Sequence, residues 1–241
     1  MKKKIYLIIL LFIGAIVFLA FSTTNEVLEN KILYHIVDLK NQEIGFFLEK
    51  EDGEKIKNFK NLQKWLKAKN KNLVFAMNGG MYNKDFSPQG LYIENGITIN
   101  KIDTTQIGYG NFYMQPNGVF YITKDLQGRI ITSKDFTNEN VKFATQSGPM
   151  LLIKGKIHNS FNKGSKNLNI RNGVGILPNG KLVFAMSKEK INFYDFANYF
   201  KSLGCLNALY LDGFISKTYL PEKGFTNMKG EFGVIIGEIK N

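Results

Sequence analysis

Residues 191–213 read INFYDFANYFKSLGCLNALYLDG, and this stretch decides the class of fold. Asn192 is suited to cap a helix, and Gly204 predicts where that helix ends. Between them the apolar residues recur at helical spacing: Phe193, Phe196, Ala197, Phe200 and Leu203. The apolar residues 206–211 then predict a buried strand that runs into Asp212-Gly213. A helix, a glycine turn and a buried strand in this order are typical of α/β packing.

Tight-turn signals elsewhere in the chain predict β-hairpins. Each signal is an Asn-Gly or Lys-Gly pair beside strand-like segments, at residues 94–96, 116–118, 154–156 and 178–180. The segments on both sides of a turn, such as 111–115 and 119–123, are predicted as strands. A further amphipathic helix is predicted from about Phe59 to Lys69. We therefore expect an α+β fold, a single mixed-sheet domain rich in hairpins with a few packed helices.

The amino terminus predicts export. Met1 to Lys4 is cationic and residues 5–21 carry no charge, which is the pattern of a signal segment. Small residues permit cleavage after Ser22, but the run is also just long enough for a marginal membrane span. We therefore expect a signal peptide or membrane anchor (1–22), a linker (23–30) and one domain (31–241). The protein is expected to be periplasmic, extracellular or anchored on the outer side of a membrane.

Composition excludes several classes of protein. The 241 residues are 44% hydrophobic and 22% charged, which is typical of a globular protein and excludes a wholly disordered one. A single cysteine excludes an intramolecular disulfide and a multi-cysteine metal site, and two histidines exclude a three-histidine centre. The net charge of +12 suits an anionic envelope polymer or lipid as partner, whereas an exported protein is not expected to meet nucleic acid.

Polar residues and glycines follow three predicted strands and indicate where a ligand could bind. They occupy residues 78–82, 146–149 and 212–213. Glycine allows close approach to the backbone, while amide and carboxylate side chains supply directional hydrogen bonds. Tight turns in which Asn and Asp bond to their own backbone are the alternative for any one segment. Three such segments together favour a site for a sugar-like ligand.

Arg171 is one of only two arginines in a lysine-rich chain. Its planar guanidinium offers bidentate hydrogen bonds, which favours binding of a phosphate or carboxylate. A structural ion pair is the alternative, and both interpretations stay open. His158 is predicted to lie in a turn, with general acid–base chemistry as the alternative. Cys205 is predicted to be a packed thiol rather than a nucleophile.

Six segments, read together, resemble the phosphodiester glycosidase family. They are AMNGGMYNKDFSPQGLYIENG (76–96), GNFYMQPNGVF (110–120), ATQSGPML (144–151), IRNGVGILPNGKLVFAMS (170–187), the stretch 191–213 quoted above and IS (215–216). The resemblance runs in order from about Leu73 to Gly237. It implies hydrolysis of the bond between an N-acetylglucosamine-like sugar and a phosphodiester, with release of free sugar and a phosphomonoester. The alternatives are a non-catalytic envelope protein that binds carbohydrate or sugar phosphate and, third, a phosphodiesterase that breaks the P–O bond.

The resemblance also implies which residues form the site. Asp212 is expected to be the nucleophile or the base that activates water, and Arg171 the cation that neutralises the phosphate. The expected substrate-binding residues are Asn78, Gly79, Gly80, Gln146, Ser147, Ser187, Asn192, Gly213 and Ser216. Phe214 departs from the family, in which a further glycine often follows Asp-Gly, and this ring would narrow the site or alter the accepted sugar. No cofactor is expected with certainty, and a single divalent metal held by Asp212 and backbone carbonyls stays open.

Overall fold

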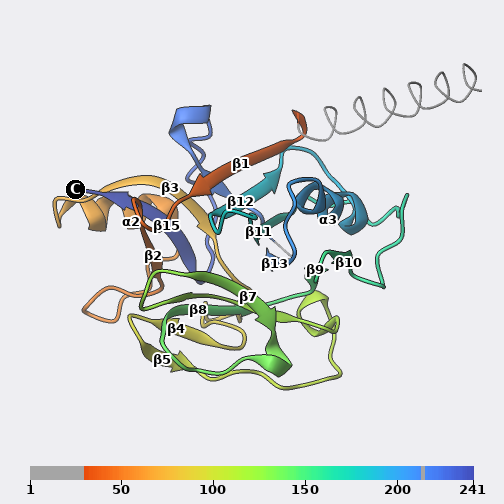
Figure 1. The fold of residues 1–241 in the computed structure, drawn as a ribbon. Helices are drawn as coiled ribbons and strands as arrows, with labels where there is room; N and C mark the ends of the chain where they lie inside the picture. Colours follow the sequence, from red (N-terminus) through yellow and green to blue (C-terminus); the bar gives the residue numbers. More distant parts are fainter. Residues whose placement is uncertain (1–29, 213–214) are drawn as a thin grey trace, which may run out of the picture.

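The computed structural model describes residues 30–212 and 215–241. The predicted leader, most of the linker, Gly213 and Phe214 therefore lie outside the described residues. Three antiparallel sheets and two α-helices make up the described part of the chain (Figure 1). The predicted α+β class is confirmed, and its strands are distributed over three sheets.

The six-stranded sheet contains the stretch that decides the fold. Its strands lie in the order β1-β12-β11-β13-β9-β10. Their bounds are Ile32–Val37 (β1), Met150–Ile153 (β9), Lys156–Ile157 (β10), Asn172–Ile176 (β11), Leu182–Ser187 (β12) and Ala208–Asp212 (β13). The strand predicted over residues 206–211 is therefore confirmed as β13, shifted by one or two residues.

The other two sheets pack beside it (Figure 1). The four-stranded sheet has the order β14-β3-β15-β2, with bounds Glu43–Phe47 (β2), Asn72–Asn78 (β3), Thr218–Tyr219 (β14) and Ile235–Lys240 (β15). The five-stranded sheet has the order β5-β4-β8-β6-β7, with bounds Tyr92–Glu94 (β4), Ile97–Asn100 (β5), Gly118–Thr123 (β6), Gly128–Thr132 (β7) and Val141–Ser147 (β8). Three short 3₁₀ helices, Asn111–Tyr113 (η1), Ser133–Asp135 (η2) and Pro221–Lys223 (η3), connect strands in the described residues.

Three of the four predicted hairpins are confirmed, and one is wrong. The turns at 94–96, 154–156 and 178–180 join β4 to β5, β9 to β10 and β11 to β12. The turn at 116–118 does not join two strands, because residues 111–113 form η1 rather than a strand. Gly118 already belongs to β6, where a Cβ would clash with Met150, so this glycine serves packing instead of a turn.

Both predicted α-helices are confirmed, and their caps follow the sequence signals. α2 spans Phe59–Lys67 and α3 spans Phe193–Ser202. The side chain of Asn192 accepts a hydrogen bond from the Asp195 N–H at 2.8 Å and so caps α3. Gly204 follows the helix with a φ of 79°, a conformation that favours glycine. The buried side chains of α2 pack in one cluster with buried residues of β3 and β15. The buried side chains of α3 pack in a second cluster with residues of β9 and β13.

A cluster of phenylalanines joins the three sheets in the core. Phe75 of β3 and Phe120 of β6 both contact Phe184 of β12, with ring centroids 5.3 and 5.9 Å apart. Phe46 of β2 contacts Phe120 at 5.7 Å. All four rings are almost completely buried. The ends of the strands are thereby fixed relative to one another, which is the condition for a site assembled from several sheets.

A buried histidine–glutamate pair ties β1 to β15. His35 Nε2 lies 2.6 Å from Glu238 Oε2, and Gln42 Nε2 donates to the same oxygen at 2.9 Å. On the other side of the ring, His35 Nδ1 lies 3.7 Å from Glu222 Oε1. Burial alone would raise the pKa of Glu238, but the hydrogen bonds from His35 and Gln42 hold it below the usual value.

We expect this pair to make stability depend on pH in the acid range. Because the pKa of Glu238 is lower in the folded protein, its ionised form stabilises the fold above the unfolded pKa of about 4.3. That contribution is lost as the pH falls through the folded pKa. The Glu238→Gln variant should be less stable than wild type by about 1–3 kcal/mol at pH 7, with a smaller difference near pH 3. Urea unfolding at both pH values, with the exposed Glu189→Gln as control, measures this, and an unchanged difference would contradict it.

Candidate functional site

Strand ends from all three sheets meet where the sequence predicted a ligand. β11 begins at Asn172, which pairs with Met186 near the end of β12 and with Asp212 at the end of β13. Asn172 also contacts Asn78 at the end of β3, and Ser147 at the end of β8 contacts β13. The three predicted polar segments are therefore brought together by strands that are far apart in sequence.

An amide pair holds the junction between β3 and β11. Asn172 Nδ2 donates to the backbone oxygen of Asn78 at 2.9 Å and to its side-chain oxygen at 3.0 Å. The Asn78 side-chain oxygen also accepts from the Lys217 N–H at 2.8 Å, while its Nδ2 donates to the Ile215 carbonyl. Both asparagines are fully buried. The Asn78 amide thus fixes residues 215–217, the segment that follows β13.

Asn172 was not among the predicted site residues. Its side-chain oxygen is buried and accepts no hydrogen bond from any residue that the structure describes. A buried acceptor without a donor is costly, and such groups occur where a ligand, water or ion completes the bonding. Asn172 directly follows Arg171 in the quoted segment 170–187, but no local pattern in the sequence distinguished it from a turn residue.

β13 carries an extra residue next to Asp212, the candidate nucleophile or base. Asn172 pairs with Asp212, but the next residue of β11 pairs with Tyr210, so Leu211 is the extra residue of a β-bulge. The Ser147 hydroxyl donates to the Leu211 carbonyl at 2.8 Å. Bulges occur next to active sites, where they redirect a side chain. Ser147 therefore supports the bulged end of β13, and its contact with a substrate stays a prediction.

Gly79 and Gly80 lie where β3 leaves its sheet. The Gly79 N–H donates to the Val234 carbonyl at 2.9 Å, and a Cβ on Gly79 would clash with Ile236. A Cβ on Gly80 would clash with the Thr145 hydroxyl. Close packing gives a structural reason for both glycines, and their contact with a sugar stays a prediction.

The Gln146 amide is occupied by the protein itself. Its oxygen accepts from the N–H groups of Leu91 and Asp103 at 3.0 and 2.8 Å. Its nitrogen donates to the Asp103 carbonyl and the Ser133 hydroxyl at 2.7 and 3.0 Å. Gln146 thus fastens the loop around Asp103 to β8. Direct binding of a sugar by this amide, which stays a prediction, requires exchange of one of these bonds.

Arg171 is a buried cation held by carbonyl oxygens and an aromatic ring. Its Nε donates to the Ile191 carbonyl at 2.8 Å, and one terminal nitrogen donates to the Asn167 carbonyl at 3.0 Å. The guanidinium carbon lies 3.5 Å from the centroid of Phe193, a cation–π contact. Burial lowers the pKa of Arg171, and Tyr210 partly offsets this. Among the side chains that the structure describes, which do not include that of Asp212, no carboxylate lies within ion-pair distance of Arg171. The ion-pair alternative therefore stays a prediction.

Three further predicted residues make contacts around this framework. The Ser187 hydroxyl accepts from the Arg171 N–H at 2.9 Å. Asn192, besides capping α3, donates to the Asp195 carboxylate at 2.7 Å. The Ser216 hydroxyl donates to the Ile170 carbonyl at 3.1 Å. Each of these side chains orders the loops around Arg171, and their contacts with a substrate stay predictions.

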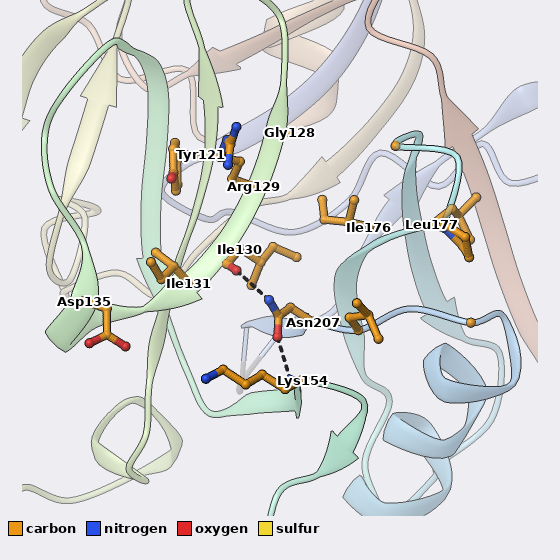
Figure 2. Close-up of a pocket in the computed structure, with 14 residues that line it drawn as sticks. Tyr121, Gly128, Arg129, Ile130, Ile131, Asp135, Lys154, Ile176, Leu177 and Asn207 are labelled. Carbon is orange, nitrogen blue, oxygen red and sulfur yellow. Dashed lines mark hydrogen bonds between the residues drawn. The ribbon is translucent and has the colours of Figure 1, made fainter.

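Two concave surfaces differ in their relation to this junction. A groove of about 740 Å³ begins directly after Gly80 and includes Ile215. Figure 2 shows another cleft, of about 1060 Å³, where Asn207 donates to the Ile130 carbonyl at 3.1 Å and accepts from the Lys154 N–H at 2.9 Å. Since β13 starts beside Asn207 and ends at the junction, the cleft of Figure 2 lies at the opposite end of the sheet.

Cys205 and His158, the two further side chains considered for reactivity in the sequence, are both buried. Burial raises the pKa of Cys205 to about 12, and the predicted packed thiol is confirmed. His158 stacks on Phe161 with ring centroids 4.8 Å apart, and burial lowers its pKa. Among the side chains described in residues 30–211 and 215–241, no group of three or more His, Cys, Asp or Glu is placed to hold a metal ion. The same residues contain no helix with the length and apolarity to span a membrane.

Comparison with known proteins agrees with the resemblance. The sequence model of the phosphodiester glycosidase family matches residues 71–233. The chain is 44% identical over 146 residues to the uncharacterized protein YigE of Escherichia coli K12, a match that covers 60% of this chain and only 57% of YigE. The fold of this chain resembles that of the catalytic domain of zebrafish N-acetylglucosamine-1-phosphodiester alpha-N-acetylglucosaminidase, a structure auto-inhibited by its pro-peptide. The TM-score is 0.55 at 16% identity, and the match covers 86% of this chain and 82% of that one. A hypothetical protein from Synechocystis gives a TM-score of 0.54 at 12% identity, over 87% of this chain and 59% of that one.

We expect the Asn78 amide to be essential for the order of the site. Asn78→Ala leaves the Lys217 N–H and the Ile215 carbonyl without their partner, so the free energy of unfolding should fall by about 2–4 kcal/mol. The Lys217 amide should also exchange its hydrogen faster than in wild type. Asn138→Ala is the matched control, because Asn138 is exposed and makes one side-chain bond, to Thr98 at 3.2 Å. Its loss should cost less than about 0.5 kcal/mol, and equal effects of the two variants would refute the assignment.

Proposed function

Because the chain belongs to the phosphodiester glycosidase family, we propose that it hydrolyses the bond between the anomeric carbon of a sugar and a phosphodiester. The products are the free sugar and a phosphomonoester. The observation that carries this proposal is the buried Arg171, which is held by two carbonyl oxygens and Phe193 directly before β11, the strand whose first residue pairs with Asp212. A fixed cation at a strand-end junction suits a substrate that brings its own negative charge.

The chemistry requires less of the protein than ordinary glycoside hydrolysis. An alkoxide is a poor leaving group, so most glycosidases use two carboxylates, one of them to protonate it. A phosphate leaves readily, since the second pKa of a phosphomonoester is about 6. One carboxylate and one cation are then sufficient. In this proposal the bond from C1 to the phosphate oxygen breaks, water supplies the new C1–OH, and the proton released ends on the carboxylate or the phosphate.

We assign the carboxylate to Asp212 and the cation to Arg171. Asp212 acts either as the nucleophile or as the base that removes the proton from water. Arg171 is held rigidly by the Ile191 and Asn167 carbonyls and by Phe193, so its charge needs no reorganisation as negative charge grows on the leaving phosphate. The open oxygen of Asn172, beside position 212 in the register, supports a role in accepting a hydrogen bond from a sugar hydroxyl or amide.

The proposal is tested with the full chain and an N-acetylglucosamine-α-1-phosphodiester, with free sugar and phosphomonoester measured separately. Wild type should release both, and Asp212→Asn should lower kcat by about 10²–10⁴-fold. Asp125→Asn, in the turn between β6 and β7, is the matched control and should turn over normally. Parallel assays with EDTA show whether a divalent ion takes part.

Two outcomes would overturn the assignment. Full turnover by Asp212→Asn removes this residue from the mechanism. Binding of the phosphodiester by wild type without any product, with or without added divalent ions, identifies the protein as a sugar-phosphate-binding member of the family instead of an enzyme.

A further inference from the structure

The loop between β5 and η1 exposes two large apolar side chains at its end. Ile107 is 90% exposed and Tyr109 is 101% exposed, the highest fractions among the large hydrophobic side chains that the structure describes. Residues 104–112, which include both, contain no charged side chain. We call residues 106–109 the loop tip. Single exposed apolar residues are common on protein surfaces, but two of them together at the end of one uncharged loop indicate a surface that meets an apolar partner.

The base of this loop is fixed, so the tip is held in place before any partner binds. The Asp103 N–H donates to the Gln146 side-chain oxygen at 2.8 Å, and the Asp103 carbonyl accepts from the Gln146 nitrogen at 2.7 Å. The Tyr113 hydroxyl donates to the Asp103 carboxylate at 3.1 Å. A Cβ on Gly108 would clash with the Tyr113 ring, so the backbone of the tip packs on that ring. A tip ordered in this way loses little entropy when a partner covers its side chains.

Exposed lysines lie beside the uncharged tip. Lys101 begins the loop. Residues 104–106 line a hollow of about 650 Å³ that also contains Lys134. On the other limb of the loop, Gly110 lines the groove beside the junction, to which Lys84 belongs. The apolar tip therefore has a cationic side chain on each limb of its loop and one at its start.

The charge of the whole chain acts in the same direction. Without the three lysines of residues 1–22, the chain has 29 basic and 20 acidic residues, a net charge of +9. Asp103 and Glu231 are the carboxylates in the linings of the two hollows, and Asp103 already accepts the hydrogen bond of Tyr113. A cationic protein collects at an anionic membrane surface, and this attraction adds to the insertion of apolar side chains.

The small size of the tip favours a lipid surface over a protein partner. A stable protein–protein contact buries about 800 Å² on each partner, far more than two side chains offer. A bilayer accepts a few apolar side chains, and tyrosine favours the level of the headgroups because its ring is apolar and its hydroxyl polar. The predicted export of the chain brings such a surface within reach of the domain.

We propose that the loop tip inserts Ile107 and Tyr109 into an anionic membrane surface while the lysines beside it contact the lipid phosphates. The inference does not depend on the proposed hydrolysis, because it concerns the attachment of the domain and not its chemistry. It has a consequence for the site: Gly110 and Asn111 line the groove beside the junction, so an inserted tip holds the junction close to the membrane.

The test places an environment-sensitive dye on the tip of the full chain. Gln106→Cys provides the attachment point, since Gln106 is exposed, whereas Cys205 is buried and its pKa is raised to about 12. Vesicles of equal parts phosphatidylcholine and phosphatidylglycerol should shift the emission of the dye to the blue, and vesicles of phosphatidylcholine alone should shift it less. Leu126→Cys, in the turn between β6 and β7, carries the same dye as a control and should not respond.

Substitutions at the tip test the two side chains. Ile107→Ser and Tyr109→Ser should each lower the equilibrium constant for insertion, read from the dye at position 106, by about 10-fold. Ile97→Ser is the matched control, because Ile97 is 67% exposed at the other end of β5, and it should leave the response unchanged. All three variants should unfold at the same temperature as wild type, since the substituted side chains are exposed.

Four outcomes would overturn the inference. Sedimentation of the chain with the vesicles, without a change in the dye at position 106, assigns attachment to the predicted leader alone. A response that survives both Ile107→Ser and Tyr109→Ser contradicts the insertion of these side chains. A response without vesicles that grows with protein concentration identifies a second copy of the chain as the partner. An equal response to both kinds of vesicle contradicts the role of the lysines.

Discussion

The side-chain amides of Asn78 and Asn172 meet where two sheets touch, and the candidate site depends on that contact. β3 and β11 belong to different sheets and share no ladder of backbone hydrogen bonds. The amide pair connects them and, through the Lys217 N–H and the Ile215 carbonyl, also fixes the segment after β13. Buried amides in a low-dielectric junction are strongly directional, so this pairing specifies one relative position of the strand ends. Burial of apolar side chains alone would permit several.

Arg171, like the two asparagines, is a buried polar group that partners from other parts of the chain hold in place, but it carries a charge. Burying a guanidinium is costly, and two carbonyl oxygens and the face of Phe193 offset only part of that cost. A structural arginine is commonly satisfied by a carboxylate, which would neutralise its field. Here the described side chains supply dipoles and a ring, which fix the position of the cation. The phosphate of the proposed substrate would meet a cation that needs no reorganisation.

Local signals in the sequence predicted the elements, and long-range contacts decided the roles of the polar residues. Asn192 and Gly204 set the limits of α3 because capping is a property of a few consecutive residues. The same reasoning failed at 116–118, where Gly118 avoids a clash with Met150 from another sheet instead of adopting a turn conformation. Gln146 looked like a ligand-binding amide from its neighbours in sequence, yet its partners at Asp103 and Ser133 become visible only in the fold.

Hydrogen-bond accounting separates the amides that build this protein from those available to a ligand. Asn78, Gln146 and Asn207 each join elements distant in sequence and use both the oxygen and the nitrogen of the amide. The side-chain oxygen of Asn172, by contrast, accepts no hydrogen bond from any residue described. Composition cannot make this distinction, because all four are the same chemical group in a chain rich in amides. In the cleft of Figure 2, the Asn207 amide connects the walls and both of its polar atoms are used. The open oxygen of Asn172 therefore distinguishes the junction from the cleft at the other end of β13, because only at the junction does a buried amide need a further donor.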